Sequence, residues 1–289
     1  MSPYFLRYNN MSYYGYNGVK CMKEYFEIVD VMGRRILDAY GDPTIEVEIT
    51  LDDGTLGRAS VPACDDNPEN INTEIAEALL GLNALDQTNI DKILIDVDGS
   101  EECTRLGAGA VFASSLACAR AAAEGAGLSL YNYIGGINAK TIPLPVIDLY
   151  DDGDFYLVPS EAEDFFDALC ICRDALDEQE ENELPAEGGQ YRIISASEFN
   201  EKYRFVAAEE YATLTMLLDK ISELRREGFE PVLCSSADES CDSSLADIAV
   251  AENMGFVCFG KPGTPGSSEK YNEILRIEEE LSDRVIFAQ

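Results

Sequence analysis

The chain has 289 residues, of which 46% are hydrophobic and 26% are charged, as expected for a globular protein of one or two domains. Its 55 acidic residues outnumber 21 basic ones, and the resulting net charge of −34 disfavours binding to nucleic acid or to an anionic membrane surface. The chain has no histidine, so a Ser-His-Asp triad, a Cys-His pair and a histidine-liganded metal are excluded.

The cysteines, the apolar runs and the first residues indicate where in the cell the protein works and how its chain begins. Nine cysteines, an odd number without a regular spacing, indicate reduced thiols and a cytoplasmic protein. We find no apolar run long enough to span a membrane. Residues 1–23 are rich in Tyr, Asn and Gly, and we expect them to form a flexible N-terminal extension.

Residues 24–137 are predicted to form an α+β domain. Its second strand alternates apolar and charged residues, and Asp52-Asp53-Gly54 then favours a tight turn. A helix over Thr73–Leu82 follows, and the small residues of Leu106–Ala117 favour close helix packing. The three strands are expected at Tyr25–Val31, Thr44–Leu51 and Leu56–Val61.

Residues 138–289 alternate short apolar strands with helices, a pattern typical of parallel α/β structure. Strands are predicted at Leu144–Leu149, Asp154–Val158, Tyr191–Ser195, Tyr203–Ala207, Val232–Cys234 and Phe256–Phe259. Helices are predicted at Glu163–Asp177, Glu210–Arg226, Ser243–Asn253 and Asn272–Ser282. The strand, helix and strand from Pro231 to Phe259 form a βαβ unit with parallel strands.

Three blocks carry a resemblance to a known family. Leu245-Ala-Asp-Ile-Ala-Val250 and the block from Lys270 to Leu281 resemble the C-terminal end of enolase, the glycolytic phosphopyruvate hydratase. The block from Gly33 to Thr44 is similar to the enolase pattern Ala-Arg-Glu-Ile-Leu-Asp-Ser-Arg-Gly-Asn-Pro-Thr. The resemblance implies an enolase-type N-terminal domain followed by a (β/α) barrel. Because a complete barrel takes roughly 250 residues, residues 138–289 are expected to form a truncated, incomplete one.

The positions that carry enolase chemistry differ in this sequence. Enolases use a lysine base, a glutamate acid and magnesium ions. The resemblance places the base at Ala207, a site histidine at Ser235 and a substrate-binding lysine at Cys258. The loop whose serine binds magnesium in enolases is replaced by Ala63–Pro68. We therefore expect no cofactor, with magnesium needed only if residual enolase activity exists.

Three residues remain as candidates for a catalytic role. Glu187 lies in a Gly-Gly turn that resembles the turn carrying the enolase acid, and Asp154 stands where a site carboxylate stood. Lys261 follows Cys258 closely enough to reach the same space. The alternatives are an exposed surface glutamate and an ordinary turn lysine.

Three cysteines could also gather at the strand ends. Cys234, Cys241 and Cys258 would then form a thiol or soft-metal site, and the alternative is that they serve as small apolar residues.

The resemblance favours a catalytically inactive paralogue that acts as a binding or regulatory subunit. The alternatives are a residual lyase that converts 2-phosphoglycerate to phosphoenolpyruvate, or acts on a related acid, and a relic with no selected role. The expected partner is a second copy or a full-length enolase. The contact would place the Arg34 region of one subunit against Glu278–Glu280 of the other.

Overall fold

The computed structural model describes residues 25–62, 64, 66–100, 102–177, 189–235 and 240–288. The predicted extension at 1–23 and the candidate acid Glu187 lie outside the described residues. In the described part of the chain, no helix is long and apolar enough to cross a membrane.

The first domain contains the predicted antiparallel sheet, in the order β1 (Ile28–Leu37), β2 (Pro43–Leu51) and β3 (Leu56–Ser60). The prediction for the first strand was wrong in its bounds. β1 pairs with β2 from Ile28 to Leu37, so the strand starts three residues later than predicted and runs six residues further, into the block that begins at Gly33. The pairing between β1 and β2 extends to the turn that connects them, where Leu37 and Pro43 form the last pair.

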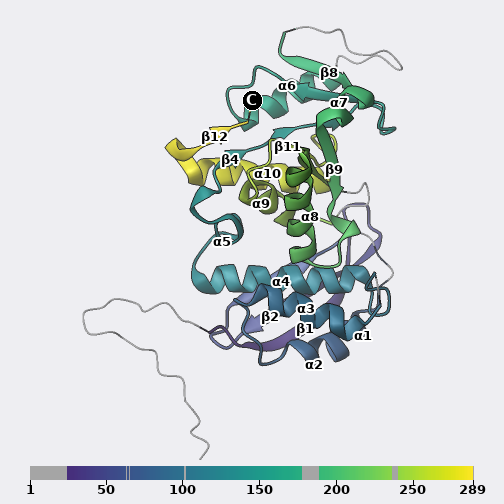
Figure 1. Ribbon diagram of the computed structural model, residues 1–289, viewed down its shortest axis with the longest axis vertical. Helices are drawn as coiled ribbons and strands as arrows, with labels where there is room; N and C mark the ends of the chain where they lie inside the picture. Colours follow the sequence, from purple (N-terminus) through teal and green to yellow (C-terminus); the bar gives the residue numbers. More distant parts are fainter. Residues whose placement is uncertain are drawn as a thin grey trace, which may run out of the picture.

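The helices of this domain follow the sheet in the chain, and several of them pack against it. They are α1 (Pro68–Asn70), the π-helix η1 (Ile71–Ile75), α2 (Ala76–Leu79), α3 (Gln87–Asp98), α4 (Ala108–Ala126) and α5 (Leu130–Gly135). The helical stretch predicted from Thr73 begins at Pro68, where Asn67 caps it by accepting a hydrogen bond from the Glu69 N–H. Figure 1 shows α4 between this sheet and helix α8 (Leu214–Glu227) of the second domain.

The second domain contains nine short strands. They are β4 (Thr141–Ile142), β5 (Leu144–Pro145), β6 (Ile147–Asp148), β7 (Phe155–Pro159), β8 (Tyr191–Ser195), β9 (Tyr203–Ala207), β10 (Glu230–Cys234), β11 (Phe256–Cys258) and β12 (Ile286–Phe287), counted over the described residues. Four form a parallel sheet in the order β5-β11-β10-β9, and three form an antiparallel sheet in the order β6-β7-β8. The other two, β4 and β12, pair with each other in parallel.

Besides α8, the helices of this domain are η2 (Gly136–Asn138), α6 (Phe165–Asp177), α7 (Ala196–Lys202), η3 (Ala208–Glu210), α9 (Ser244–Ala251), α10 (Pro265–Leu281) and η4 (Ser282–Arg284). The predicted start of the last long helix was wrong. α10 begins seven residues before Asn272, because Pro265 is well suited to the first helical turn and Ser267, Lys270 and Tyr271 are buried.

The parallel and antiparallel sheets join into one curved sheet that does not close. The two sheets are joined because the chain passes from β5 to β6 through Val146 alone. The joined sheet stays open because its two end strands, β8 and β9, are not hydrogen bonded to each other among the described strands. The barrel is therefore incomplete, as predicted. A side chain of α7, a helix that the sequence did not predict, helps to fill the open side. Phe199 is 1% exposed, and its ring centroid lies 4.7–5.1 Å from those of Tyr156, Tyr203 and Phe205.

Candidate functional site

The carboxyl ends of three parallel strands bring Ala207, Cys234 and Cys258 into one row. Cys234 on β10 is the register partner of Ala207 on β9 and of Cys258 on β11. Side chains of register partners on parallel strands point to the same face of the sheet. Ala207 and Cys258 therefore lie on either side of Cys234. The resemblance places the enolase base at the first of these positions and a substrate-binding lysine at the second.

The row faces the inside of the curved sheet. Residues two positions earlier on the same strands, Phe205, Val232 and Phe256, pack in the interior cluster with Tyr156. Cys258 itself packs against this cluster. The intervening Val206, Leu233 and Val257 belong instead to the main core beneath the helices. Because side chains alternate along a strand, the row lies at the inner mouth of the incomplete barrel.

The environment of Cys234 disfavours ionisation of its thiol. Cys234 and Cys258 are reduced and half-buried. Burial raises the pKa of Cys234 well above its usual range, and the neighbouring Cys258, Glu209 and Glu210 raise it further. Burial also raises the pKa of Tyr156 to about 12, with contributions from Asp148, Cys258 and Cys234.

The third cysteine of the predicted cluster is set apart. Cys241 is exposed and follows the end of β10 by seven residues, whereas Cys234 and Cys258 are register partners. The structure therefore brings together two of the three cysteines.

Asp154 and Lys261 lie at the same end of the barrel. β7 runs antiparallel to β6, so Asp154, just before β7, lies at the face where the parallel strands end. The Lys261 ammonium donates a 2.7 Å hydrogen bond to Asp151, in the same β6–β7 turn. Lys261 thus lies beside the β6–β7 turn, and its contact there is an ion pair with Asp151.

The described residues do not fit a magnesium site of the kind that the resemblance implies. Magnesium requires several oxygen ligands in octahedral geometry, and the row offers a methyl group and two thiols. The carboxylate of Asp148 already accepts the N–H groups of Tyr150, Asp151 and Gly153. Across the part of the chain that the structure describes, no three carboxylate or thiol side chains are grouped to hold a metal ion.

A largely buried aspartate missed by the sequence analysis joins the two domains beside this mouth. Asp242 accepts hydrogen bonds from the N–H groups of Ser60 at 3.0 Å and Ser244 at 2.7 Å, and it forms a 3.3 Å ion pair with Arg120. Burial opposes its ionisation, but Arg120 and the hydrogen-bond donors outweigh burial and lower its pKa. Asp242 lines a cavity of about 30 Å³ together with Ser60, Pro62, Phe112, Leu116, Ala208, Glu209, Ser235, Ser240, Leu245 and Lys270.

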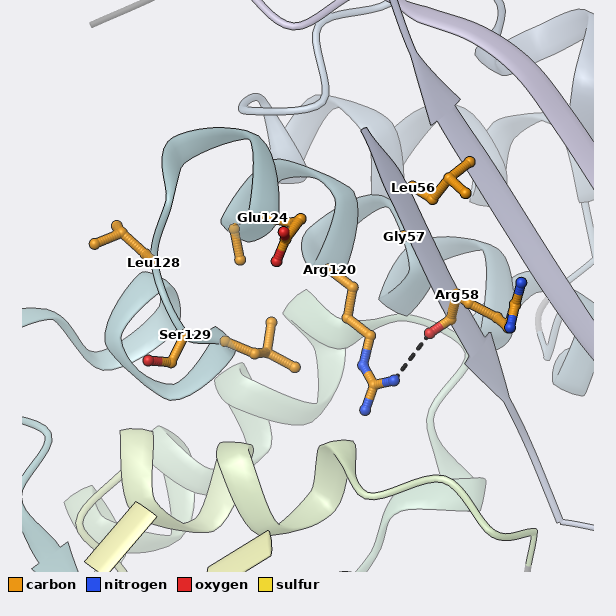
Figure 2. A pocket seen from close by; sticks show the side chains of 9 residues that line it. Leu56, Gly57, Arg58, Arg120, Glu124, Leu128 and Ser129 are labelled. Carbon is orange, nitrogen blue, oxygen red and sulfur yellow. Dashed lines mark hydrogen bonds between the residues drawn. The ribbon is translucent and has the colours of Figure 1, made fainter. Parts of the chain in front are cut away.

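A larger open pocket of about 320 Å³ lies on the other side of Arg120, between β3, the end of α4 and the start of α5. Figure 2 shows the Arg120 guanidinium donating to the carbonyl oxygen of Arg58, a 3.0 Å hydrogen bond. The same guanidinium also contacts Asp242 and Ser243. The Arg120 side chain thus connects α4 to β3 and to the residues at the start of α9.

Two buried aspartates also link the domains. Asp91 of α3 accepts from the Ser115 hydroxyl at 2.6 Å and from the Thr215 N–H, at the first turn of α8, at 2.9 Å. Asp247 of α9 accepts from the N–H of Tyr131 of α5 at 3.2 Å. Asp247 stands in an otherwise apolar helical stretch, and that pattern is the signal in the sequence that could have identified it.

Two protein-family models match the chain. Residues 63–134, which include α1 to α4, match the model described as enolase, N-terminal domain. Residues 205–289, which include the row of Ala207, Cys234 and Cys258, match enolase, C-terminal TIM barrel domain. The matches occur in the family's order, agree with the two domains of the structure and together cover more than half of the chain. This chain therefore belongs to the enolase family.

Proposed function

We propose that this member of the enolase family is catalytically inactive and acts as a binding or regulatory subunit. The observation that supports this proposal most strongly is the row at the inner mouth of the barrel. Ala207 stands where the resemblance places the base, and a methyl group cannot accept a proton. Cys258 stands where the resemblance places a substrate-binding lysine, and a cysteine side chain has no positive charge with which to attract a carboxylate or phosphate as an ammonium does.

The proposal includes the absence of a resident magnesium ion. Enolase chemistry requires metal ions to stabilise a highly charged intermediate, so the base and the metal sites act as a unit. Loss of several parts of such a unit is expected to abolish turnover, because the remaining groups are not individually sufficient.

The test is conversion of 2-phosphoglycerate to phosphoenolpyruvate in the presence of Mg²⁺. We expect no turnover above that of Glu187→Gln and Asp154→Asn proteins purified in the same way. These variants serve as matched controls, because a contaminating host enolase would give equal rates in all three preparations. Turnover that is proportional to protein concentration and is lost in either variant would support the residual lyase instead.

A thermal measurement tests the metal part of the proposal. A ligand that binds only the folded state raises the free energy of unfolding by RT ln(1 + [L]/Kd), so a magnesium site would give a saturable rise in Tm. We expect only a small, non-saturating rise from screening of the net charge of −34, equal to that with a sodium salt of matched ionic strength. A saturable rise that disappears in the Asp154→Asn protein would contradict the proposal.

A further inference from the structure

We propose that Cys234 and Cys258 together form a binding site for one soft monovalent metal ion, Cu(I). The site lies at the inner mouth of the incomplete barrel and uses two thiols that are register partners on adjacent parallel strands. It is independent of the proposed loss of enolase activity, because it requires only the placement of these two side chains.

The spacing of the strands suits a single ion between two sulfur atoms. Neighbouring strands lie about 4.8 Å apart, and register partners extend side by side from them. A metal–thiolate bond is about 2.3 Å long, so two thiolates on opposite sides of one ion lie about 4.6 Å apart. Cys234 and Cys258 can therefore reach the same ion without a shift of the backbone. A disulfide requires a closer approach, with Cβ atoms about 3.8 Å apart.

The kind of ligand selects the kind of metal. Thiolates are soft ligands and favour Cu(I) over hard cations such as Mg²⁺. Zinc prefers four ligands in a tetrahedral arrangement, and within the described residues no group of three suitable side chains surrounds this point. Two ligands suffice for Cu(I), and the third member of the row, Ala207, is too small to block the space beside Cys234.

The surroundings favour a bound cation over free thiolates. The interior cluster below the row is apolar and includes Val232, Phe256 and the ring of Tyr156. Two carboxylates of η3, Glu209 and Glu210, raise the pKa of Cys234. Asp148 of β6 acts on the neighbouring Tyr156 and raises its pKa. In the metal-free protein burial and the two η3 carboxylates oppose ionisation of the Cys234 thiol. A bound cation compensates the negative charge of the two sulfurs.

Binding follows a balanced exchange. Both thiols lose their protons to the buffer, and two S–Cu bonds form, with no change in oxidation state. Because two protons are released per ion, affinity should rise about a hundredfold per pH unit while both thiols of the free protein are protonated. A site with one thiol would give about a tenfold rise per pH unit.

The test titrates the reduced, full-length protein with Cu(I) under anaerobic conditions in competition with the chromophoric chelator bicinchoninate. We expect Cys234→Ser and Cys258→Ser each to remove one equivalent of tightly bound Cu(I), with a loss of affinity of about a hundredfold or more, because half of the ligand set is lost. Cys170→Ser is the matched control, since Cys170 is also half-buried but lies on α6. Equal binding by the unsubstituted protein and both serine variants overturns the proposal.

A second measurement needs no variant and so does not depend on folding of the substituted proteins. Phenylarsine oxide forms two As–S bonds with a pair of adjacent thiols and releases water. We expect one equivalent to protect Cys234 and Cys258 together from alkylation in the native protein, as read by peptide mass spectrometry. Alkylation of either residue at the rate found without the arsenical would show that the two thiols do not act as a pair, and would also overturn the proposal.

Discussion

Asp247 shows how one buried side chain makes stability depend on pH. The residue is 5% exposed within α9, and its carboxyl group accepts a hydrogen bond from the N–H of Tyr131. Burial, followed by the charge of Glu273, raises its pKa to about 7, while Arg120 and the Tyr131 N–H act in the opposite direction. Between its unfolded and folded pKa values, the folded chain therefore holds a proton that the unfolded chain releases.

We predict that Asp247→Asn removes this pH dependence. Because the folded pKa is raised, the native state loses stability as pH rises from about 4 to about 7, and the loss is complete above the folded pKa. Asparagine is neutral at every pH and can still accept from the Tyr131 N–H. The variant should therefore gain up to about 4 kcal/mol over the unsubstituted protein between pH 4 and pH 8. Urea unfolding at both pH values measures this difference.

The control is Asp219→Asn, which changes an exposed carboxylate on α8. Its unfolding free energy should follow that of the unsubstituted protein at both pH values. If Asp247→Asn does the same, the carboxyl group of Asp247 is ionised in the folded state and does not make stability depend on pH.

At this scale the strands predicted from the sequence account for where Ala207, Asp154 and Lys261 lie in the fold. Their positions follow from where predicted strands end, which is local information. The sequence did not identify Asp91 or Asp242 as links between the domains. Each of them is defined by partners more than 100 residues away in the chain, Thr215 for Asp91 and Arg120 for Asp242, and no local pattern encodes such distances.

The close packing of α4 on β3 depends on one glycine. A Cβ at Gly57 would lie 2.2 Å from the Ala117 carbonyl oxygen and 2.2 Å from the Ala121 nitrogen, both backbone atoms of α4. These atoms cannot turn aside as a flexible side chain could. The buried small residues of α4 therefore allow helix and strand to approach until their backbones touch.

We predict that Gly57→Ala destabilises the fold by about 3 kcal/mol or more, because one methyl group forces the strand and the helix apart. Urea unfolding followed by circular dichroism measures the change. Gly255→Ala is the matched control, since its Cβ would meet no atom within 4 Å, and it should change stability by less than about 1 kcal/mol. Similar losses in both variants would show that backbone flexibility, not the contact with α4, decides the effect.

Elements with a clear apolar pattern were predicted best. The bounds of β8 and β9 agree with the predictions, and the core of α8 does as well. α7 was missed because its seven residues span only about two turns, too few for a helical period to be recognised. Its Phe199 fills the open side of the barrel, a role that depends on the tertiary arrangement of the strands.

At the scale of the whole molecule, three aspartates hold the two domains together. Asp91 joins α3 to the first turn of α8, Asp242 joins the start of α9 to α4 and β3, and Asp247 joins α9 to α5. The domains are therefore expected to unfold together and to present their outer surfaces as one body.

One of these outer surfaces is suited to association. Met32 on β1, Leu37 at the end of β1 and Tyr40 in the turn after it are 45%, 66% and 62% exposed. Met32 shares a face of the sheet with Arg34, whereas Leu37 and Tyr40 extend the exposed surface at the end of the strand. Arg34 lies on the same strand and forms ion pairs with Glu46 at 3.2 Å and Glu48 at 2.9 Å. Exposed apolar side chains around a charged cluster are typical of protein interfaces.

We predict that the protein forms a homodimer, or a heterodimer with a full-length enolase, through this surface and that Arg34→Glu shifts it to the monomer. The substitution places a third carboxylate beside Glu46 and Glu48 and would repel the acidic Glu278–Glu280 segment of a second subunit. Light scattering at micromolar concentration and about 0.15 M salt measures the mass. At this ionic strength the Debye length is about 8 Å, so the net charge of −34 does not by itself prevent association.

The Arg58→Glu variant is the control that distinguishes loss of a contact between subunits from a disturbance within the subunit. Arg58 on β3 pairs with the same two carboxylates, Glu46 at 3.5 Å and Glu48 at 2.6 Å, so either variant disturbs the same cluster within the chain. Arg34 differs because it lies on the strand with the exposed apolar residues. We therefore expect Arg58→Glu to remain dimeric while Arg34→Glu does not. If both variants dissociate, the charged cluster acts by shaping the sheet and not by direct contact with the second subunit. If the unsubstituted protein is monomeric and does not bind purified full-length enolase, assembly through this surface is ruled out.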